Sequence, residues 1–291
     1  MSVDIVIRDT SYSVPERILA SDDFYYSVED RLGAGGNGVV HQCTREVDGE
    51  IYAIKFLTSL GDVRRCARFE RERGVMSTLS VAPHNHLIRL VTDGTVRAFQ
   101  KIRRRSFEKV MPFVVMERAD LSLREFIKNE AHPISSAVYM AQFRGLVSAL
   151  EVLHRHAIHR DIKPDNILVV GERWVISDFG LCAAVGDTGD GTDLTRHWEV
   201  VGPRFWMSPE ANNRSIGLDE EISFASDVFQ LAAVFWWVVN RRHPSGILCR
   251  DDWSGLGNLY DPVAKALQHS TCRRFESATA FKEAVVEAIE S

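Results

Sequence analysis

Apolar positions change their spacing along this chain, and the change separates a strand-like part from a helical part. From Phe24 to about Phe56 the pattern is strand-like, with a glycine cluster between two apolar stretches. Residues 62–79 place apolar side chains at helical spacing among many arginines and predict a helix. Two further strand-like segments are expected around Leu87–Gly94 and Pro112–Glu117.

Further along the chain the pattern becomes helical. Ser135–His154 carries apolar residues at helical spacing, and Ser226–Val239 is apolar nearly all round. A helix that is apolar on every side is typical of the centre of a core. We therefore expect an α+β fold of two lobes, with a small β-rich lobe over residues 24–119 and a larger α-helical lobe over residues 120–291. A short connector near Arg118–Asp120 joins them.

The chain has 291 residues, and 45% of them are hydrophobic, which is enough for two lobes. Its five cysteines form no C-x-x-C motif and no close pair. This pattern argues against zinc and disulfides and favours a reducing compartment, the cytoplasm. Residues 1–23 are expected to be a polar leader without a signal-peptide core, and the sequence leaves open whether it is disordered, autoinhibitory or a docking strand. The longest apolar run, Leu231–Val239, is too short to span a bilayer.

Charge is uneven along the chain, although the net charge is only −5. Residues 97–109, RAFQKIRRRSFEK, hold six Lys/Arg and one acid between two expected strands, which is long for a hairpin connection. We interpret this segment as a solvated basic loop. The alternative is a patch, shared with the arginines of residues 64–73, for an acidic partner, a membrane surface or nucleic acid. The overall charge does not favour nucleic-acid binding.

A glycine-rich segment, GAGGNGVV, follows the first expected strand. Gly33, Gly35, Gly38 and Val40 match the pattern G-x-G-x-x-G-x-V, in which glycines let backbone N–H groups approach phosphate oxygens. A plain glycine-rich turn would give a similar pattern. A strand, not a helix, follows, and this argues against the Walker A and Rossmann types of phosphate loop.

Lys55 lies in the next apolar strand, where a buried ammonium needs an anionic partner. The candidates are the phosphates of a nucleotide and an acid on the following helix, Glu70 or Glu72. We favour Glu72 because the residues three, four and seven positions further on are apolar and share its helix face. The alternative is that Lys55 extends to solvent from an edge strand.

Two motifs in the second half carry the strongest chemical signal. Residues 159–166 read HRDIKPDN, and Asp178-Phe179-Gly180 follow twelve residues after Asn166. Together with the glycine segment, the sequence AIK ending at Lys55 and Ser208-Pro209-Glu210, they have the order and spacing of eukaryotic-type (Hanks-type) protein kinases. The chain resembles this family over about residues 24–290.

The resemblance implies a two-lobed kinase fold that uses ATP and Mg²⁺, with Mn²⁺ as an alternative ion. Asp161 would accept or orient the proton of the attacking hydroxyl, and Lys163 would reach the γ-phosphate. Asn166 and Asp178 would supply oxygen ligands to the metal ion.

Other positions acquire roles only through the resemblance. Met116 corresponds to the gatekeeper, and Glu117 to Ala119 form the hinge that would bind adenine through its backbone. The apolar residues expected around the purine ring are Val40, Ala53 and Leu168. The resemblance also implies that Asp227 braces the catalytic loop and that Glu210 pairs with Arg274.

Lys163 favours Ser or Thr as the acceptor on protein substrates, and autophosphorylation is expected. The chain departs from the family at Gly202-Pro203, where a Thr is usual, and in the short stretch after Val239, which leaves little room for the family's substrate-docking helix. Arg160 precedes Asp161, as in kinases switched by phosphorylation, and our hypothesis is that Glu199 supplies a permanent negative charge opposite it.

Two other functions remain open on the sequence. A pseudokinase that acts as a scaffold usually lacks one of Lys55, Asp161, Asn166 and Asp178, and this chain has them all. A small-molecule phosphotransferase of the same fold generally lacks the S-P-E segment and the lysine at position 163, and this chain has both.

Overall fold

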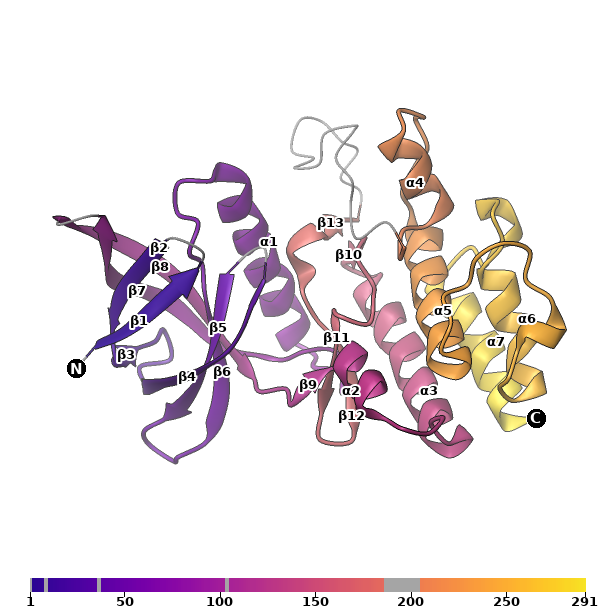
Figure 1. Cartoon of the computed structure of the whole chain (residues 1–291), viewed down its shortest axis with the longest axis horizontal. Coiled ribbons are helices and arrows are strands. Elements are labelled where there is room, and N and C mark those ends of the chain that lie inside the picture. The colour runs from indigo at the N-terminus through magenta and orange to yellow at the C-terminus, as the bar shows by residue number, and fades with distance from the viewer. Residues whose placement is uncertain (1, 8–9, 36–37, 103–104, 186–204) are drawn as a thin grey trace. The chain divides into compact units, whose positions relative to one another are not determined.

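The computed structural model describes residues 2–7, 10–35, 38–102, 105–185 and 205–291. The chain forms two compact units (Figure 1). Unit 1 comprises Met1–Ala82 and Ile88–Ala119, and unit 2 comprises Pro83–Leu87 and Asp120–Ser291. The α+β class expected from the sequence is confirmed, because unit 1 is mainly β-sheet and unit 2 mainly α-helix.

Unit 1 contains one eight-stranded sheet in its described part, with the order β1-β2-β7-β8-β6-β5-β4-β3 and antiparallel pairing throughout. Its strands are β1 (Ser2–Ile7), β2 (Thr10–Pro15), β3 (Arg17–Leu19), β4 (Tyr25–Gly35), β5 (Gly38–Arg45), β6 (Ile51–Phe56), β7 (Leu90–Ile102) and β8 (Arg105–Glu117).

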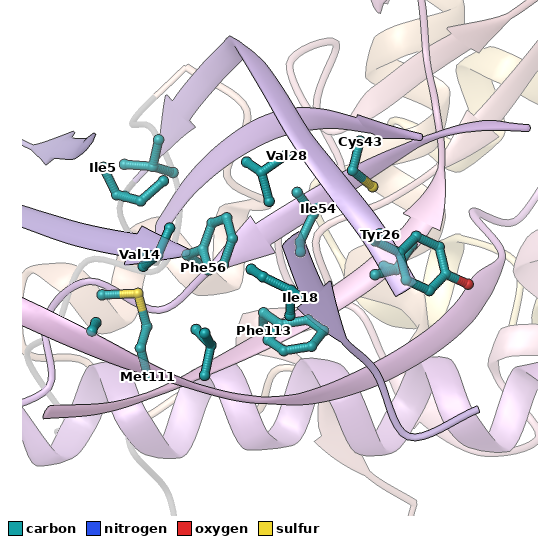
Figure 2. Close-up of a cluster of buried hydrophobic side chains, with 14 of the residues drawn as sticks. Ile5, Val14, Ile18, Tyr26, Val28, Cys43, Ile54, Phe56, Met111 and Phe113 are labelled. Atoms are coloured by element: carbon teal, nitrogen blue, oxygen red, sulfur yellow. The ribbon is translucent and has the colours of Figure 1, made fainter. Parts of the chain in front are cut away.

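The predicted leader is part of this sheet, because β1, β2 and β3 all lie within residues 1–23. Strands β5, β6 and β8 bury side chains on both faces, so the face turned away from the helix of unit 1 also needs a cover. Ile5 and Val14 of the leader strands are fully buried in this core, with Ile54, Phe56 and Phe113 (Figure 2). The leader is therefore a structural part of unit 1 and not a separate segment.

The expectation of a basic loop at residues 97–109 is wrong. The strands expected to end near Gly94 and to begin near Pro112 continue through this segment as β7 and β8, and they pair from Val96↔Met111 to Ile102↔Arg105. The reason is alternation: Val96 and Ala98 face the core while Arg97 faces solvent. The leader strand β2 also pairs with β7, between Ser11 and Lys101, which supports the extension.

Helix α1 (Val63–Ser80) begins after Asp62, whose carboxylate accepts hydrogen bonds from the N–H groups of Arg64 and Arg65. This start agrees with the helix predicted over residues 62–79. Its buried face includes Glu72 and Met76, as the apolar spacing indicated.

Unit 2 is built around α5 (Phe224–Asn240), most of whose side chains are buried, as expected for a core helix. The rings of Phe143 and Phe235 stack with their centres 3.7 Å apart, and this stack joins α3 to α5. The other helices are α2 (Leu123–Asn129), α3 (Ser136–Leu153), α4 (Pro209–Ser215), α6 (Gly257–Ala266) and α7 (Ala278–Glu290). Residues 241–256, all of them described, form only a 3-10 turn at Arg250–Asp252, in agreement with the short stretch expected there.

Unit 2 also contains two small sheets of short strands among its described residues. Strands β9 (Leu121–Ser122), β11 (Ile167–Val170) and β12 (Arg173–Ile176) form a small sheet, and β10 (Ala157–Ile158) pairs with β13 (Ala183–Ala184). Among the described residues, every helix is too short or too polar to cross a membrane.

Candidate active site

The residues predicted for the site fall into two groups, one in each unit. Unit 1 holds Glu72, the predicted partner of Lys55, and the residues predicted to contact the nucleotide: Gly33, Gly35, Gly38, Val40, Ala53, Lys55, Met116, Glu117 and Ala119. Unit 2 holds those predicted to act at the transferred phosphate, together with one apolar contact: Asp161, Lys163, Asn166, Asp178 and Leu168.

The glycine segment forms the end of the β4–β5 hairpin, where Gly33 pairs with Val40 and Gly35 with Gly38. A Cβ at Gly38 would overlap the carbonyl oxygen of Phe56, so close packing of the sheet requires this glycine. A Cβ at Gly33 or Gly35 would meet no atom within 4 Å. The backbone at these two positions is therefore open to a ligand, as a phosphate site needs.

One face of the sheet gathers the other predicted nucleotide contacts. Val40 is directly opposite Lys55 in the β5–β6 pair, and Ala53 is directly opposite Met116 in the β6–β8 pair. Since opposed and alternate residues share a face, these four side chains lie on the same side of the sheet.

Lys55 donates from Nζ to both carboxylate oxygens of Glu72, each at 2.6 Å. Only 10% of the lysine side chain and 4% of the glutamate side chain are exposed. The acid that the helical spacing favoured is thus the partner of Lys55. Neither charge could stay in this buried position without the other.

The hinge residues have partners within unit 1. The N–H of Glu117 donates to the carbonyl oxygen of Arg89 at 3.0 Å, and the N–H of Arg89 donates back to the Glu117 carboxylate at 3.0 Å. The first of these two bonds occupies the N–H of Glu117, so this N–H donates within unit 1. Ala119 is half-buried at the end of unit 1, and Leu168 is half-buried in β11 opposite Ser122 and Val175.

Asp161 is 5% exposed, and its two carboxylate oxygens differ in their contacts. Oδ2 accepts hydrogen bonds from Lys163 Nζ at 2.6 Å and Asn166 Nδ2 at 2.8 Å. Oδ1 is buried and has no hydrogen-bond partner among the described residues. Burial raises the pKa of Asp161, and the Lys163 ammonium opposes this effect. The result is a carboxylate with one oxygen held in place and one oxygen available to accept a proton.

Asp227 at the start of α5 holds the loop that carries Asp161. Its carboxylate accepts from the N–H groups of His159 at 2.6 Å and Arg160 at 2.8 Å, and from His154 Nε2 at 2.9 Å. Burial would raise the pKa of Asp227, but the interactions with His154 and these N–H groups outweigh it and keep the pKa low. Arg160 has a φ of 69°, a strained value for a non-glycine residue that this bracing maintains.

Asn166 and Asp178 are the two residues predicted to hold a metal ion. Asp178 lies at the start of a 3-10 turn, Phe179–Leu181, and its charge raises the pKa of Asp161. The described residues contain no cluster of three His, Cys, Asp or Glu side chains that could hold a metal ion. An ion at Asn166 and Asp178 would thus need phosphate or water oxygens to complete its coordination, which suits Mg²⁺.

Glu210 and Arg274 form the predicted pair, fully buried, with two parallel hydrogen bonds of 2.8 Å. The Ser226 hydroxyl donates to the same carboxylate at 2.5 Å. Burial would raise the pKa of Glu210, but Arg274 outweighs it and lowers the pKa. This pair anchors α4, which begins directly after Ser208, to α5.

Sequence reasoning missed Arg124, which donates from Nε and Nη2 to the two oxygens of Asp165 at 2.6 and 2.8 Å. The partners are 41 residues apart, and no local spacing signals the contact. Two sequence-based expectations concern residues outside the described part of the chain, namely the charge at Glu199 and the departure from the family at Gly202-Pro203.

Comparisons with known proteins agree with this geometry. The family model for the protein kinase domain matches residues 26–253. The chain is 30% identical over 249 residues, 84% of its length, to the serine/threonine-protein kinase PknB of Mycolicibacterium smegmatis, of which the match covers 35%. It is 29% identical over 230 residues, 76% of its length, to the serine/threonine-protein kinase pkn3 of Myxococcus xanthus, of which the match covers 38%. The chain thus spans little more than a third of these relatives. With the kinase-domain match over most of its length, the chain belongs to the Hanks-type Ser/Thr protein kinase family.

Proposed function

We propose that this protein transfers the γ-phosphate of ATP to Ser or Thr hydroxyls of protein substrates. The observation that carries the proposal is the buried Oδ1 of Asp161, which has no hydrogen-bond partner in the part of the chain that the structure describes and lies beside an oxygen held by Lys163 and Asn166. A buried acceptor without a partner is costly unless a ligand supplies the donor. An acceptor hydroxyl of a substrate is such a donor.

Each residue around Asp161 has a part in the transfer. Asp161 accepts the proton of the substrate hydroxyl, and its raised pKa brings it closer to the pH at which it works. Lys163 keeps the carboxylate in position and carries positive charge toward the transferred group. Asn166 donates to both the side chain and the carbonyl oxygen of Asp161, which fixes the geometry of the loop.

We further propose that Gly33, Gly35 and Lys55 hold the phosphates of ATP. The apolar contacts of the purine ring would come from Val40, Ala53, Met116 and Leu168, and its backbone contacts from Glu117–Ala119. Asn166 and Asp178 would hold a divalent ion, Mg²⁺ or Mn²⁺. When bound, this ion neutralises phosphate charge.

The choice of Ser or Thr rests on Lys163 and on the names of the similar kinases. Autophosphorylation is part of the proposal, since the sequence between Gly180 and Ser208 contains three threonines. The cytoplasm is the proposed compartment because all five cysteines are free.

We also propose that the basic surface of β7 and β8 binds an acidic partner. Residues 97–109 carry six Lys/Arg and one acid, and exposed Arg97, Arg105 and Lys109 lie on β7 and β8. We expect Arg97→Glu and Lys109→Glu together to weaken binding of poly-glutamate to the protein. Unchanged binding would exclude this surface.

The test of the main proposal is transfer of ³²P from γ-labelled ATP with Mg²⁺, followed by phosphoamino-acid analysis. We expect label on Ser or Thr, and a loss of about 10²–10⁴-fold in Asp161→Asn, the size of a general-base contribution. Asp178→Asn should also abolish transfer. Asp251→Asn, at an exposed acid outside the residues proposed for the site, is the matched control.

The outcomes separate the alternatives. Label on Tyr would contradict the acceptor, and label on a small molecule but no protein would favour a small-molecule phosphotransferase. Nucleotide binding without transfer, under conditions with and without generic protein substrates, would favour a scaffold.

A further inference from the structure

A groove in unit 2 lies outside the residues predicted from the motifs. It has a volume of about 620 Å³ and lies between α2, the α2–α3 connection and the C-terminal end of α5. Its lining includes apolar surface from Pro133 and Trp237 and several charged side chains. Apolar surface edged by charges is typical of a site for an extended peptide.

The charges that line the groove are mainly positive. Arg124, Lys128 and Arg241 line the groove, together with one acid, Glu130. Two further acids lie outside the lining: Asp165 pairs with Arg124, and Glu125, which caps the start of α2, interacts with Lys128. In contrast, residues 120–291 as a whole carry a net charge of −7. The groove therefore concentrates positive charge on an otherwise acidic part of the chain.

Two of the three cations form no salt bridge among the described residues, although the charge of Glu125, three residues before Lys128 on α2, acts on Lys128. Lys128 is exposed on α2 and forms no ion pair there. Arg241 donates from Nη1 to the carbonyl oxygen of Ile127 and from Nη2 to that of His132, the latter at 2.9 Å. Carbonyl oxygens hold the guanidinium in place but do not neutralise its charge, so both cations remain available to an anion.

The groove is connected to the catalytic loop through Arg124. Its backbone N–H donates to the carbonyl oxygen of Pro164 at 3.1 Å, and its guanidinium occupies both oxygens of Asp165. Asp165 is four residues beyond Asp161. A basic substrate side chain that approached Asp165 would have to displace Arg124, whereas an acidic one meets cations. The charge next to the catalytic loop thus selects against basic substrates.

We propose that this groove binds a run of Asp or Glu residues in the protein substrate, on the flank of the acceptor Ser or Thr. Lys128 and Arg241 face the carboxylates, and Trp237 and Pro133 contact the methylene groups of the chain. The proposal rests on the kinase function proposed above and adds the class of substrate that the enzyme prefers.

The test measures binding separately from catalysis. Labelled peptides with Ala at the acceptor position, flanked on either side by Glu, Gln, Lys or phosphoserine, are titrated with the full chain in fluorescence anisotropy. We expect the Glu peptide to bind about fivefold or more tightly than the Gln peptide, and the difference to shrink as salt rises. In Lys128→Glu the preference for Glu over Gln should disappear. In the matched charge reversal Arg273→Glu, at an exposed arginine of unit 2 that does not line the groove, this preference should remain.

Equal binding of the Glu and Gln peptides would overturn the proposal. An equal loss of the preference for the Glu peptide in Lys128→Glu and Arg273→Glu would overturn it too. Tight binding of only the phosphoserine peptide would also overturn it, in favour of a previously phosphorylated substrate. The same peptides with Ser at the acceptor position then report kcat/KM. Binding with the expected preference but no phosphate transfer would refute the kinase function alone, and transfer without a preference would refute the groove alone.

Discussion

Two buried ion pairs hold segments of this protein in place. Lys55 pairs with Glu72 in unit 1, and Arg274 pairs with Glu210 in unit 2. A buried ion pair gives little net stability over an apolar pair of the same size, but removal of one partner leaves a buried charge. Such pairs therefore fix the positions of the two segments that carry them, and removal of one partner lowers the stability of the fold.

Glu72→Gln is expected to lower the free energy of unfolding by about 3–5 kcal/mol, because Lys55 would remain buried without a counter-charge. It should also weaken ATP binding. Urea denaturation and the KM for ATP are the measurements. The matched control is Glu70→Gln on the same helix, at a glutamate whose side chain is 51% exposed, with an expected change below about 1 kcal/mol. Equal effects of the two variants would contradict a buried pair.

Acidification is expected to abolish activity before it unfolds the protein. Burial raises the pKa of Asp161, so the carboxylate that accepts the proton is lost as pH falls through this raised value. The pKa of Glu210 is lowered in the folded state because Arg274 outweighs burial, so its stabilising contribution is complete above the unfolded-state pKa and is lost only as pH falls through the lowered value.

The measurement is kcat and tryptophan fluorescence across the acid range. A reversible loss of kcat at a pH where fluorescence is unchanged would support the assignment. In Glu210→Gln, unfolding should depend less on pH in the acid range. If activity and fold are lost at the same pH in the parent protein, titration of Asp161 is not the cause of the loss of activity.

At the scale of elements, close approach between backbone and side chains fixes how segments pack. In unit 2 the ring of His86 lies against α3 at Gly145, and its Nδ1 is 2.7 Å from the carbonyl oxygen of Trp174. A Cβ at Gly145 would overlap the His86 ring. This glycine lowers helix propensity, and the contact explains why a glycine is needed there.

Gly145→Ala should therefore destabilise the protein by about 1–3 kcal/mol, the cost of overpacking. Gly74→Ala is the matched control, because Gly74 is also inside a helix and a Cβ there meets no atom within 4 Å. That change should stabilise the protein by up to about 1 kcal/mol through helix propensity. The measurement is the melting temperature of each variant relative to the parent protein, under one set of conditions. The same sign of change in both would contradict the His86 contact.

At the scale of the whole molecule, the first strands complete the core of unit 1. Ile5, Tyr12 and Val14 cover the face of the sheet that carries Phe56 and Phe113 (Figure 2). Cys43 lies in the same cluster, and burial raises the pKa of its thiol to about 12. The kinase-domain match begins at residue 26, so this cover lies outside the matched region.

Ile5→Ala is expected to cost about 2–5 kcal/mol, because the side chain is fully buried. Val6→Ala is the matched control at the next position of the same strand, where the side chain is 41% exposed, and should change stability by less than about 0.5 kcal/mol. Urea denaturation and the rate at which Cys43 reacts with a thiol reagent are the measurements. If Ile5→Ala neither lowers stability nor speeds the reaction of Cys43, the strand does not cover the core.

Much of the site could be predicted because its signals are local or follow a fixed period. The spacing of apolar residues on α1 identified Glu72 as the partner of Lys55, and the apolar character of residues 226–239 identified the core helix α5. The order of the short motifs was enough for the family, because phosphate transfer requires particular side chains at particular separations.

Contacts between distant segments could not be predicted in the same way. Pairing of β2 with β7 brings residues 11–13 against residues 99–101, and nothing within either segment specifies the register. The same holds for Arg124 and Asp165, whose ion pair changes the charge beside the catalytic loop.

The sequence by itself thus determined the α+β class and the family and predicted the reacting groups, because these depend on residue identity and local spacing. Only the tertiary structure decided that residues 2–19 complete a core, that residues 97–109 are mostly strand, and that a cationic groove adjoins the catalytic loop. The physical reason is that long-range pairing is selected by burial of a whole face or by neutralisation of a charge, and both are properties of the assembled fold.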